Sequence, residues 1–87
     1  MGADFRERGT GEEGDTLSEF SERLRKLREE RKPVKSMVVV SELCGLPRSA
    51  VRKYERGEAL PGYKALISLA DYYEVSLDYL TCRTNFR

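Results

Sequence analysis

Four hydrogen-bonding side chains stand at helical spacing directly after a Gly-Leu-Pro sequence in the middle of the chain: Arg48, Ser49, Arg52 and Lys53. Residues four apart on a helix project from the same side, so Arg48 aligns with Arg52 and Ser49 aligns with Lys53. Two such rows of guanidinium, ammonium and hydroxyl groups can donate hydrogen bonds to base edges or phosphates. A solvated helix face has similar charges, but the position after a glycine-containing turn favours contact with nucleic acid.

The sequence offers little for catalysis or metal binding. It contains no histidine, and its two cysteines, Cys44 and Cys82, are far apart in the chain. A zinc site needs several such ligands at close spacing, and an enzyme needs a nucleophile, a base or a metal converging in a cleft. We therefore expect neither an enzyme nor a metal or cofactor site. The simplest interpretation of Cys44 is a small buried hydrophobe.

Positive charge is concentrated in one part of the chain. The formal net charge is only +1, yet residues 23–56 contain eleven Lys or Arg against four acids, and residues 1–15 contain five acids against two bases. Segregated charge of this kind is typical of proteins that bind a polyanion, although a solvated surface can produce the same count.

With 87 residues the chain is long enough for one domain. We expect a flexible tail over residues 1–15, a domain over residues 16–82 and a short C-terminal tail over residues 83–87. No apolar run approaches the roughly 20 residues that cross a bilayer, so no membrane segment is expected. The N-terminus lacks the apolar stretch of a secretory signal, which predicts a cytoplasmic protein.

The first element that must support the central residues is a helix. Thr16 and Glu19 have the spacing of a capping box, in which each side chain bonds the backbone N–H of the other residue. An apolar stripe at three- and four-residue steps follows, and Pro33 prevents the helix from continuing much beyond Arg31. The stripe consists of Leu17, Phe20, Leu24 and Leu27.

Two further helices should follow closely. The run from Met37 to Val40 has strand propensity, but no second run exists to pair with it, so a short helix ending at Gly45 is preferred. Pro47 suits the first position of the next helix, and Gly57 should end that helix.

The C-terminal third predicts two more helices. A fourth helix should bury Leu66, Leu69, Ala70 and Tyr73, and Ser76 can cap a last short helix. The predicted fold is therefore all-α, with five short helices. Within it, residues 36–55 fit a helix-turn-helix, in which the second helix enters the major groove of DNA.

The chain resembles the lambda-repressor-like, Cro or xenobiotic-response-element family of helix-turn-helix proteins. The resemblance lies chiefly in Gly45-Leu46-Pro47-Arg48-Ser49-Ala50-Val51-Arg52-Lys53-Tyr54-Glu55-Arg56-Gly57, and Val75-Ser76-Leu77-Asp78-Tyr79-Leu80 strengthens it. It covers about residues 20–80 and implies a compact five-helix DNA-binding domain.

The resemblance also implies roles for single residues. Base contacts fall to Arg48, Ser49 and Lys53, while Arg52 is placed to reach a base or a phosphate. Phosphate contacts fall to residues at the start of the second helix and to two basic residues further along the chain. An ion pair joins the first helix to the third. The phosphate set is Lys35, Ser36 and the N–H groups of Met37 and Val38, extended by Arg56 and Lys64; the ion pair is Arg28 with Glu55.

Three features depart from the family pattern. Met37 stands where many relatives have a glutamine that braces the DNA backbone and the first recognition side chain. Pro47 occupies a position often held by a Ser or Thr cap. The connector between the first two helices is about two residues longer than usual.

The sequence thus predicts a transcriptional regulator, a repressor by preference, that binds a palindromic double-stranded operator as a homodimer. Surplus apolar residues, Tyr72, Tyr79, Leu80 and the segment to Phe86, suggest where two copies would meet. No small-molecule ligand is indicated. The alternative is a protein-binding module on the same scaffold, of the antitoxin or anti-repressor kind, and the loss of the glutamine keeps that alternative open.

Overall fold

The structure is a computed structural model, and it describes residues 18–87. The predicted tail over residues 1–15, and Thr16 and Leu17 of the predicted capping box and stripe, lie outside the described residues. A first helix is described from residue 18 to residue 30. It is followed by α2 (Met37–Leu43), α3 (Ala50–Glu55), α4 (Tyr63–Tyr73) and α5 (Leu77–Leu80).

Residues 18–87 contain these helices and no strand, which confirms the all-α prediction. The valine-rich run is helical because Ser36 caps it: its Oγ accepts a hydrogen bond from the N–H of Val39. The first helix ends within one residue of the predicted position, ahead of Pro33, whose peptide bond with Lys32 is cis. None of the helices described here is long and apolar enough to cross a membrane.

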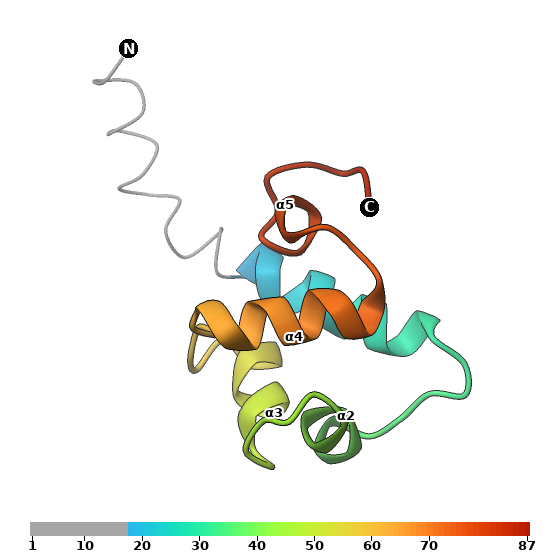
Figure 1. Cartoon of the computed structure of the whole chain (residues 1–87), viewed down its shortest axis with the longest axis vertical. Coiled ribbons are helices and arrows are strands. Elements are labelled where there is room, and N and C mark those ends of the chain that lie inside the picture. Colours follow the sequence, from blue (N-terminus) through green and yellow to red (C-terminus); the bar gives the residue numbers. More distant parts are fainter. Residues whose placement is uncertain (1–17) are drawn as a thin grey trace.

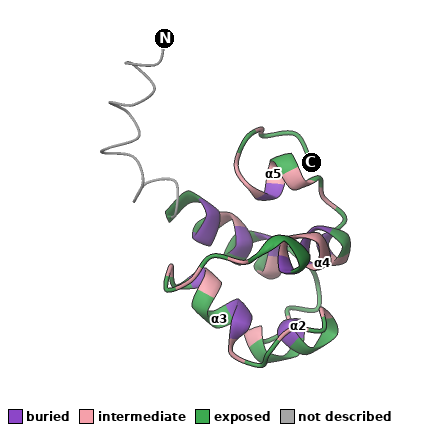
Figure 2. Ribbon diagram, turned by 60° about the vertical axis from the view of Figure 1, so that its left-hand side comes forward, coloured by how far each residue is buried: buried purple, intermediate pink, exposed green. Residues whose placement is uncertain are grey.

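The helices pack around a shared centre. In Figure 1, α4 lies across the first helix, α2 and α3 sit together at one end, and α5 with the C-terminal residues sits at the other. The buried faces turn toward this centre (Figure 2). The arrangement leaves the outer sides of α2 and α3 on the surface.

The core contains Phe20, Leu24 and Leu27 of the predicted stripe of the first helix. Of the predicted inner face of α4, Leu69, Ala70 and Tyr73 are buried, and Leu66 is only partly buried. Leu24, Val51, Leu69 and Leu80 are fully buried, and each such side chain stabilises the fold by roughly 1.5–3 kcal/mol. The expectation that Leu80 offers surface for a partner is wrong, because α5 turns this side chain into the core. The core cluster consists of Phe20, Leu24, Leu27, Val40, Val51, Leu69, Ala70, Tyr73 and Leu80.

The start of the third helix differs from the prediction. Regular α-helix begins at Ala50, three residues after Pro47. The N–H of Ala50 bonds to the carbonyl of Pro47 at 2.9 Å, so residues 47–49 form a tighter turn that leads into the helix. Arg48 and Ser49 therefore belong to this turn, and only Arg52 and Lys53 lie within α3.

The helix ends from α2 to α5 use the same hydrogen-bond pattern, in which a residue in the left-handed conformation redirects the chain. Gly45 (φ 72°) and Gly57 (φ 74°) end α2 and α3, as the sequence predicts. Glu74 (φ 59°) and Cys82 (φ 67°) fill the same position after α4 and α5, although their side chains disfavour it.

The last residues fold back onto the first helix. The guanidinium group of Arg23 donates hydrogen bonds to the carbonyl oxygens of Tyr79 (2.7 Å) and Thr84 (2.8 Å) and lies over the Tyr79 ring. Arg87 forms an ion pair with Glu30 at 2.7 Å. Residues 81–87 are thus held against the domain in this structure.

Glu74→Gly should increase stability, because glycine adopts the left-handed conformation without steric cost. The expected gain in the free energy of unfolding is about 0.5–1 kcal/mol after the greater chain entropy of glycine is included. Denaturant unfolding measures it. Glu22→Gly, at an exposed position inside the first helix, is the control and should lower stability; a loss at both sites would contradict the assignment.

Tyr73→Phe should stabilise the protein at neutral pH by about 1 kcal/mol, because the buried Tyr73 hydroxyl has no hydrogen-bond partner among the described residues. Burial, followed by the nearby Glu55 carboxylate, raises the pKa of this phenol above its ordinary value of 10.0. The folded state keeps the phenol neutral while the unfolded chain ionises, so stability should fall as the pH rises above about 10.

The phenylalanine variant should lose this part of the alkaline fall, measured by unfolding at pH 7 and at pH 11. Tyr63→Phe, at a side chain that is 74% exposed, is the matched control and should leave the alkaline fall in place. An unchanged alkaline fall in Tyr73→Phe would show that this hydroxyl does not govern it.

Candidate nucleic-acid interface

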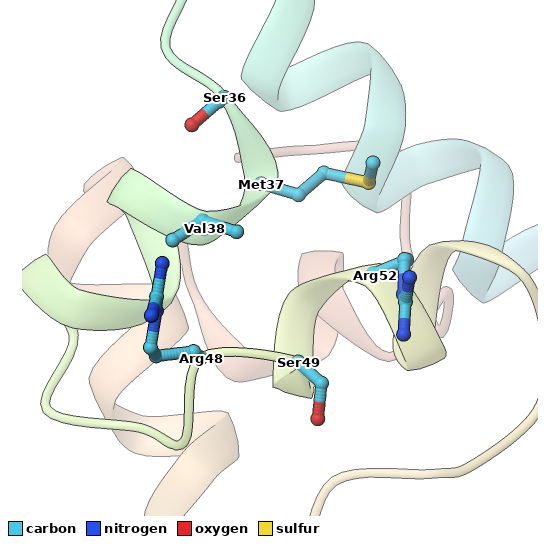
Figure 3. A pocket seen from close by; sticks show the side chains of 6 residues that line it. All are labelled: Ser36, Met37, Val38, Arg48, Ser49 and Arg52. Atoms are coloured by element: carbon cyan, nitrogen blue, oxygen red, sulfur yellow. The ribbon is translucent and has the colours of Figure 1, made fainter.

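A surface hollow of about 350 Å³ lies between the start of α2 and the turn that leads into α3. It is lined by Ser36, Met37, Val38, Arg48, Ser49 and Arg52 (Figure 3). Four of these side chains belong to the sequence-predicted site, whereas Met37 and Val38 were expected to contribute only their backbone N–H groups. We refer to this space as the hollow.

The remaining predicted residues lie outside the hollow. Lys53 is exposed on α3, and Lys64 is exposed near the start of α4. Lys35 is half-buried before α2, and Arg56 is exposed after α3, where it pairs with Glu58 at 3.1 Å.

The entry to α2 presents polar backbone toward the hollow. Ser36 caps the N–H of Val39 with its side chain and that of Val40 with its carbonyl. The N–H groups of Met37 and Val38 belong to the first turn, where a helix has no internal acceptors for them. The sequence analysis expects these two N–H groups to bind an anionic oxygen.

Ser41 holds the two helices together and was missed by the sequence analysis. Its side chain is fully buried, its Oγ donates to the carbonyl of Met37 at 2.8 Å, and it accepts from the N–H of Val51 at 3.0 Å. The hydroxyl thus satisfies a buried N–H in the first turn of α3. The available signal was a serine within the apolar face of a predicted helix, where an unpaired hydroxyl is costly.

Arg28 and Glu55, the expected ion pair, are in contact. Arg28 Nε donates to Glu55 Oε2 at 2.7 Å and Nη2 donates to Oε1 at 3.0 Å, while Nη1 donates to the carbonyl of Lys35 at 3.2 Å. The side chain of Glu55 is only 4% exposed. Its hydrogen bond raises the pKa of Arg28 above the ordinary value, so the guanidinium stays charged.

A carboxylate that the sequence analysis did not assign lies beside the predicted base-contacting residues. Glu42 of α2 approaches Arg48 at 3.6 Å, and both side chains are largely exposed. Figure 3 shows Arg48 reaching back from the turn toward α2. Such an exposed pair contributes little to stability, but it biases where the Arg48 guanidinium lies.

The described residues contain no group of three or more Cys, Asp or Glu side chains placed to hold a metal ion. The arrangement instead presents guanidinium, hydroxyl and amide donors at the start of α2, in the turn before α3 and on α3 itself. On α3, Arg52 and Lys53 are exposed.

A family model described as a helix-turn-helix domain matches residues 19–80. The chain belongs to the helix-turn-helix family, of the lambda-repressor-like or xenobiotic-response-element type. This helix-turn-helix protein is also 39% identical over 61 residues to the uncharacterized HTH-type transcriptional regulator YqaE of Bacillus subtilis (strain 168). The match covers 70% of this chain and 51% of YqaE, so the chain spans about half the length of that relative. No solved structure matches significantly.

Ser41→Ala should destabilise this helix-turn-helix protein by about 1–3 kcal/mol, because it leaves the buried N–H of Val51 without an acceptor. Chemical denaturation measures the loss. Ser68→Ala in α4 is the matched control and should change stability little, because Ser68 is only half-buried and its removal leaves no buried N–H of the kind that Ser41 satisfies. Equal effects of the two substitutions would refute the role assigned to Ser41.

Proposed function

We propose that this helix-turn-helix protein is a transcriptional regulator that binds double-stranded DNA in a sequence-specific manner and acts as a repressor. The observation that supports the proposal is the hollow, which brings hydrogen-bond donors of α2 and of the turn before α3 to one face. The family membership and the similarity to YqaE, an HTH-type transcriptional regulator by name, point the same way.

In the proposed complex the chain supplies two kinds of contact. The start of α2, with Lys35, Ser36 and the N–H groups of Met37 and Val38, binds phosphate oxygens, and Arg56 and Lys64 extend this contact. The turn and α3 face the major groove, where Arg48 donates to guanine and Ser49, Arg52 and Lys53 contact neighbouring base edges. Phosphate contacts provide affinity, and the base contacts provide specificity.

Hydrogen bonds of Arg28 hold the two contact regions in place. Arg28 anchors both the end of α3 and the carbonyl of Lys35, so the two contact regions share one support. Because one domain of this size covers limited DNA surface, we infer that two copies bind half-sites about one helical turn apart on a palindromic operator. Occupied DNA would then be closed to the transcription machinery.

Selection from a random duplex pool by the purified full chain, followed by sequencing at two salt concentrations, tests the proposal. We expect an enriched palindrome. Background that depends only on salt would refute sequence-specific binding and favour the alternative, a protein-binding module of the antitoxin or anti-repressor kind.

Arg48→Ala should weaken binding to the selected duplex by roughly 1–3 kcal/mol and relax specificity at one base position. Lys35→Ala should instead weaken binding to all sequences alike and reduce the salt dependence by about one counterion. Fluorescence anisotropy over a salt series measures both effects. Arg83→Ala is the matched control, because Arg83 is 78% exposed against 77% for Arg48 but lies after α5. If Arg48→Ala weakened all sequences equally, its base contact would be refuted.

A further inference from the structure

The lining of the hollow is mainly apolar, although it lies among the donors that the proposed function turns toward DNA. Met37 and Val38 supply the side chains on the α2 side, and Arg48 and Arg52 supply aliphatic stems on the other. Val38 is 37% exposed, so its methyl groups are open to a ligand. Hydrogen-bond donors for a phosphate or a purine edge lie at the rim of this space. The side chains of Met37 and Val38 offer none.

The major groove of DNA presents one apolar group, the C5 methyl of thymine. The other groups on its base-pair edges are hydrogen-bond donors and acceptors. The hollow is more than ten times larger than the roughly 30 Å³ that one water molecule occupies in the liquid, so a methyl group can enter together with the edge of its base. The flanking guanidinium groups of Arg48 and Arg52 suit guanine acceptors next to that base.

We propose that the hollow is a binding site for the thymine methyl group, and that it selects a thymine adjacent to guanine in each half-site. The inference rests on the proposed function and adds the base class that this surface distinguishes. It gives a use to the apolar side chains of Met37 and Val38, which line the hollow on the α2 side. Discrimination here comes from apolar contact with these two side chains.

The test uses the full chain and a duplex selected by it from the random pool. Each thymine is replaced in turn by deoxyuridine, which differs only in the missing methyl group. At one thymine of each half-site we expect the replacement to weaken binding about fourfold, the change that corresponds to one buried methylene-sized group.

Val38→Ser removes both methyl groups of this side chain and should reduce the thymine-to-deoxyuridine ratio at that position to below about twofold. Val39→Ser is the matched control, because Val39 has nearly the same exposure (39%) and the same helix but does not line the hollow. It should keep the fourfold ratio, and a retained fold in both variants is checked by circular dichroism.

Selective binding without any thymine sensitive to loss of its methyl would overturn the inference and leave the proposed function intact. A ratio that is the same in Val38→Ser and Val39→Ser would also overturn it. Failure of the pool to yield any enriched sequence would instead overturn the proposed function, and the inference with it.

Discussion

The contact between Arg28 and Glu55 is the constraint on which the rest of the site depends. It joins the first helix to the last residue of α3, and the same guanidinium reaches the carbonyl of Lys35 just before α2. One side chain therefore sets the position of three segments that are separated in sequence. Removing one partner of a buried pair of this kind costs about 3–5 kcal/mol, because the other charge is left without compensation.

A neighbouring hydrogen bond strengthens this junction. Ser21 Oγ of the first helix donates to the carbonyl of Tyr54 at 2.8 Å, one residue before Glu55. At the opposite end of α3, Ser41 connects the helix to α2 through the N–H of Val51. The short helix is thus held at both ends by polar contacts, while Val51 between them is buried in the core. A helix of six residues needs such support, since it would not be stable alone.

The side chains on the outward sides of α2 and α3 are not needed for these stabilising contacts. Val51 and Glu55 face inward, and Arg52 and Lys53 remain exposed. The apolar side chains of Met37 and Val38 complete a surface with both donors and carbon contacts. Such a mixture suits base edges in the major groove, whose pattern combines donors, acceptors and the thymine methyl.

Local residue patterns were enough to predict much of this protein. The spacing of Phe20, Leu24 and Leu27 predicted a buried helix face, and Gly45 and Gly57 marked helix ends because glycine adopts positive φ without steric cost. These features depend on short-range geometry. The absence of a partner strand also predicted that the valine-rich run is helical.

Other features depend on contacts between segments that are distant in sequence, and only the tertiary structure decided these. The three-residue delay of α3 reflects the turn from Pro47 to Ala50, which directly precedes Val51, whose N–H donates to the buried hydroxyl of Ser41. Leu80 lies in the core because α5 packs against α4, although its sequence context was equally compatible with surface. Likewise, no local pattern showed that Val38 borders Arg48 and Arg52 across the hollow. The sequence by itself determined where helices form and which residues could donate hydrogen bonds; only the packed fold decided which of them meet, because those contacts join segments that are distant along the chain.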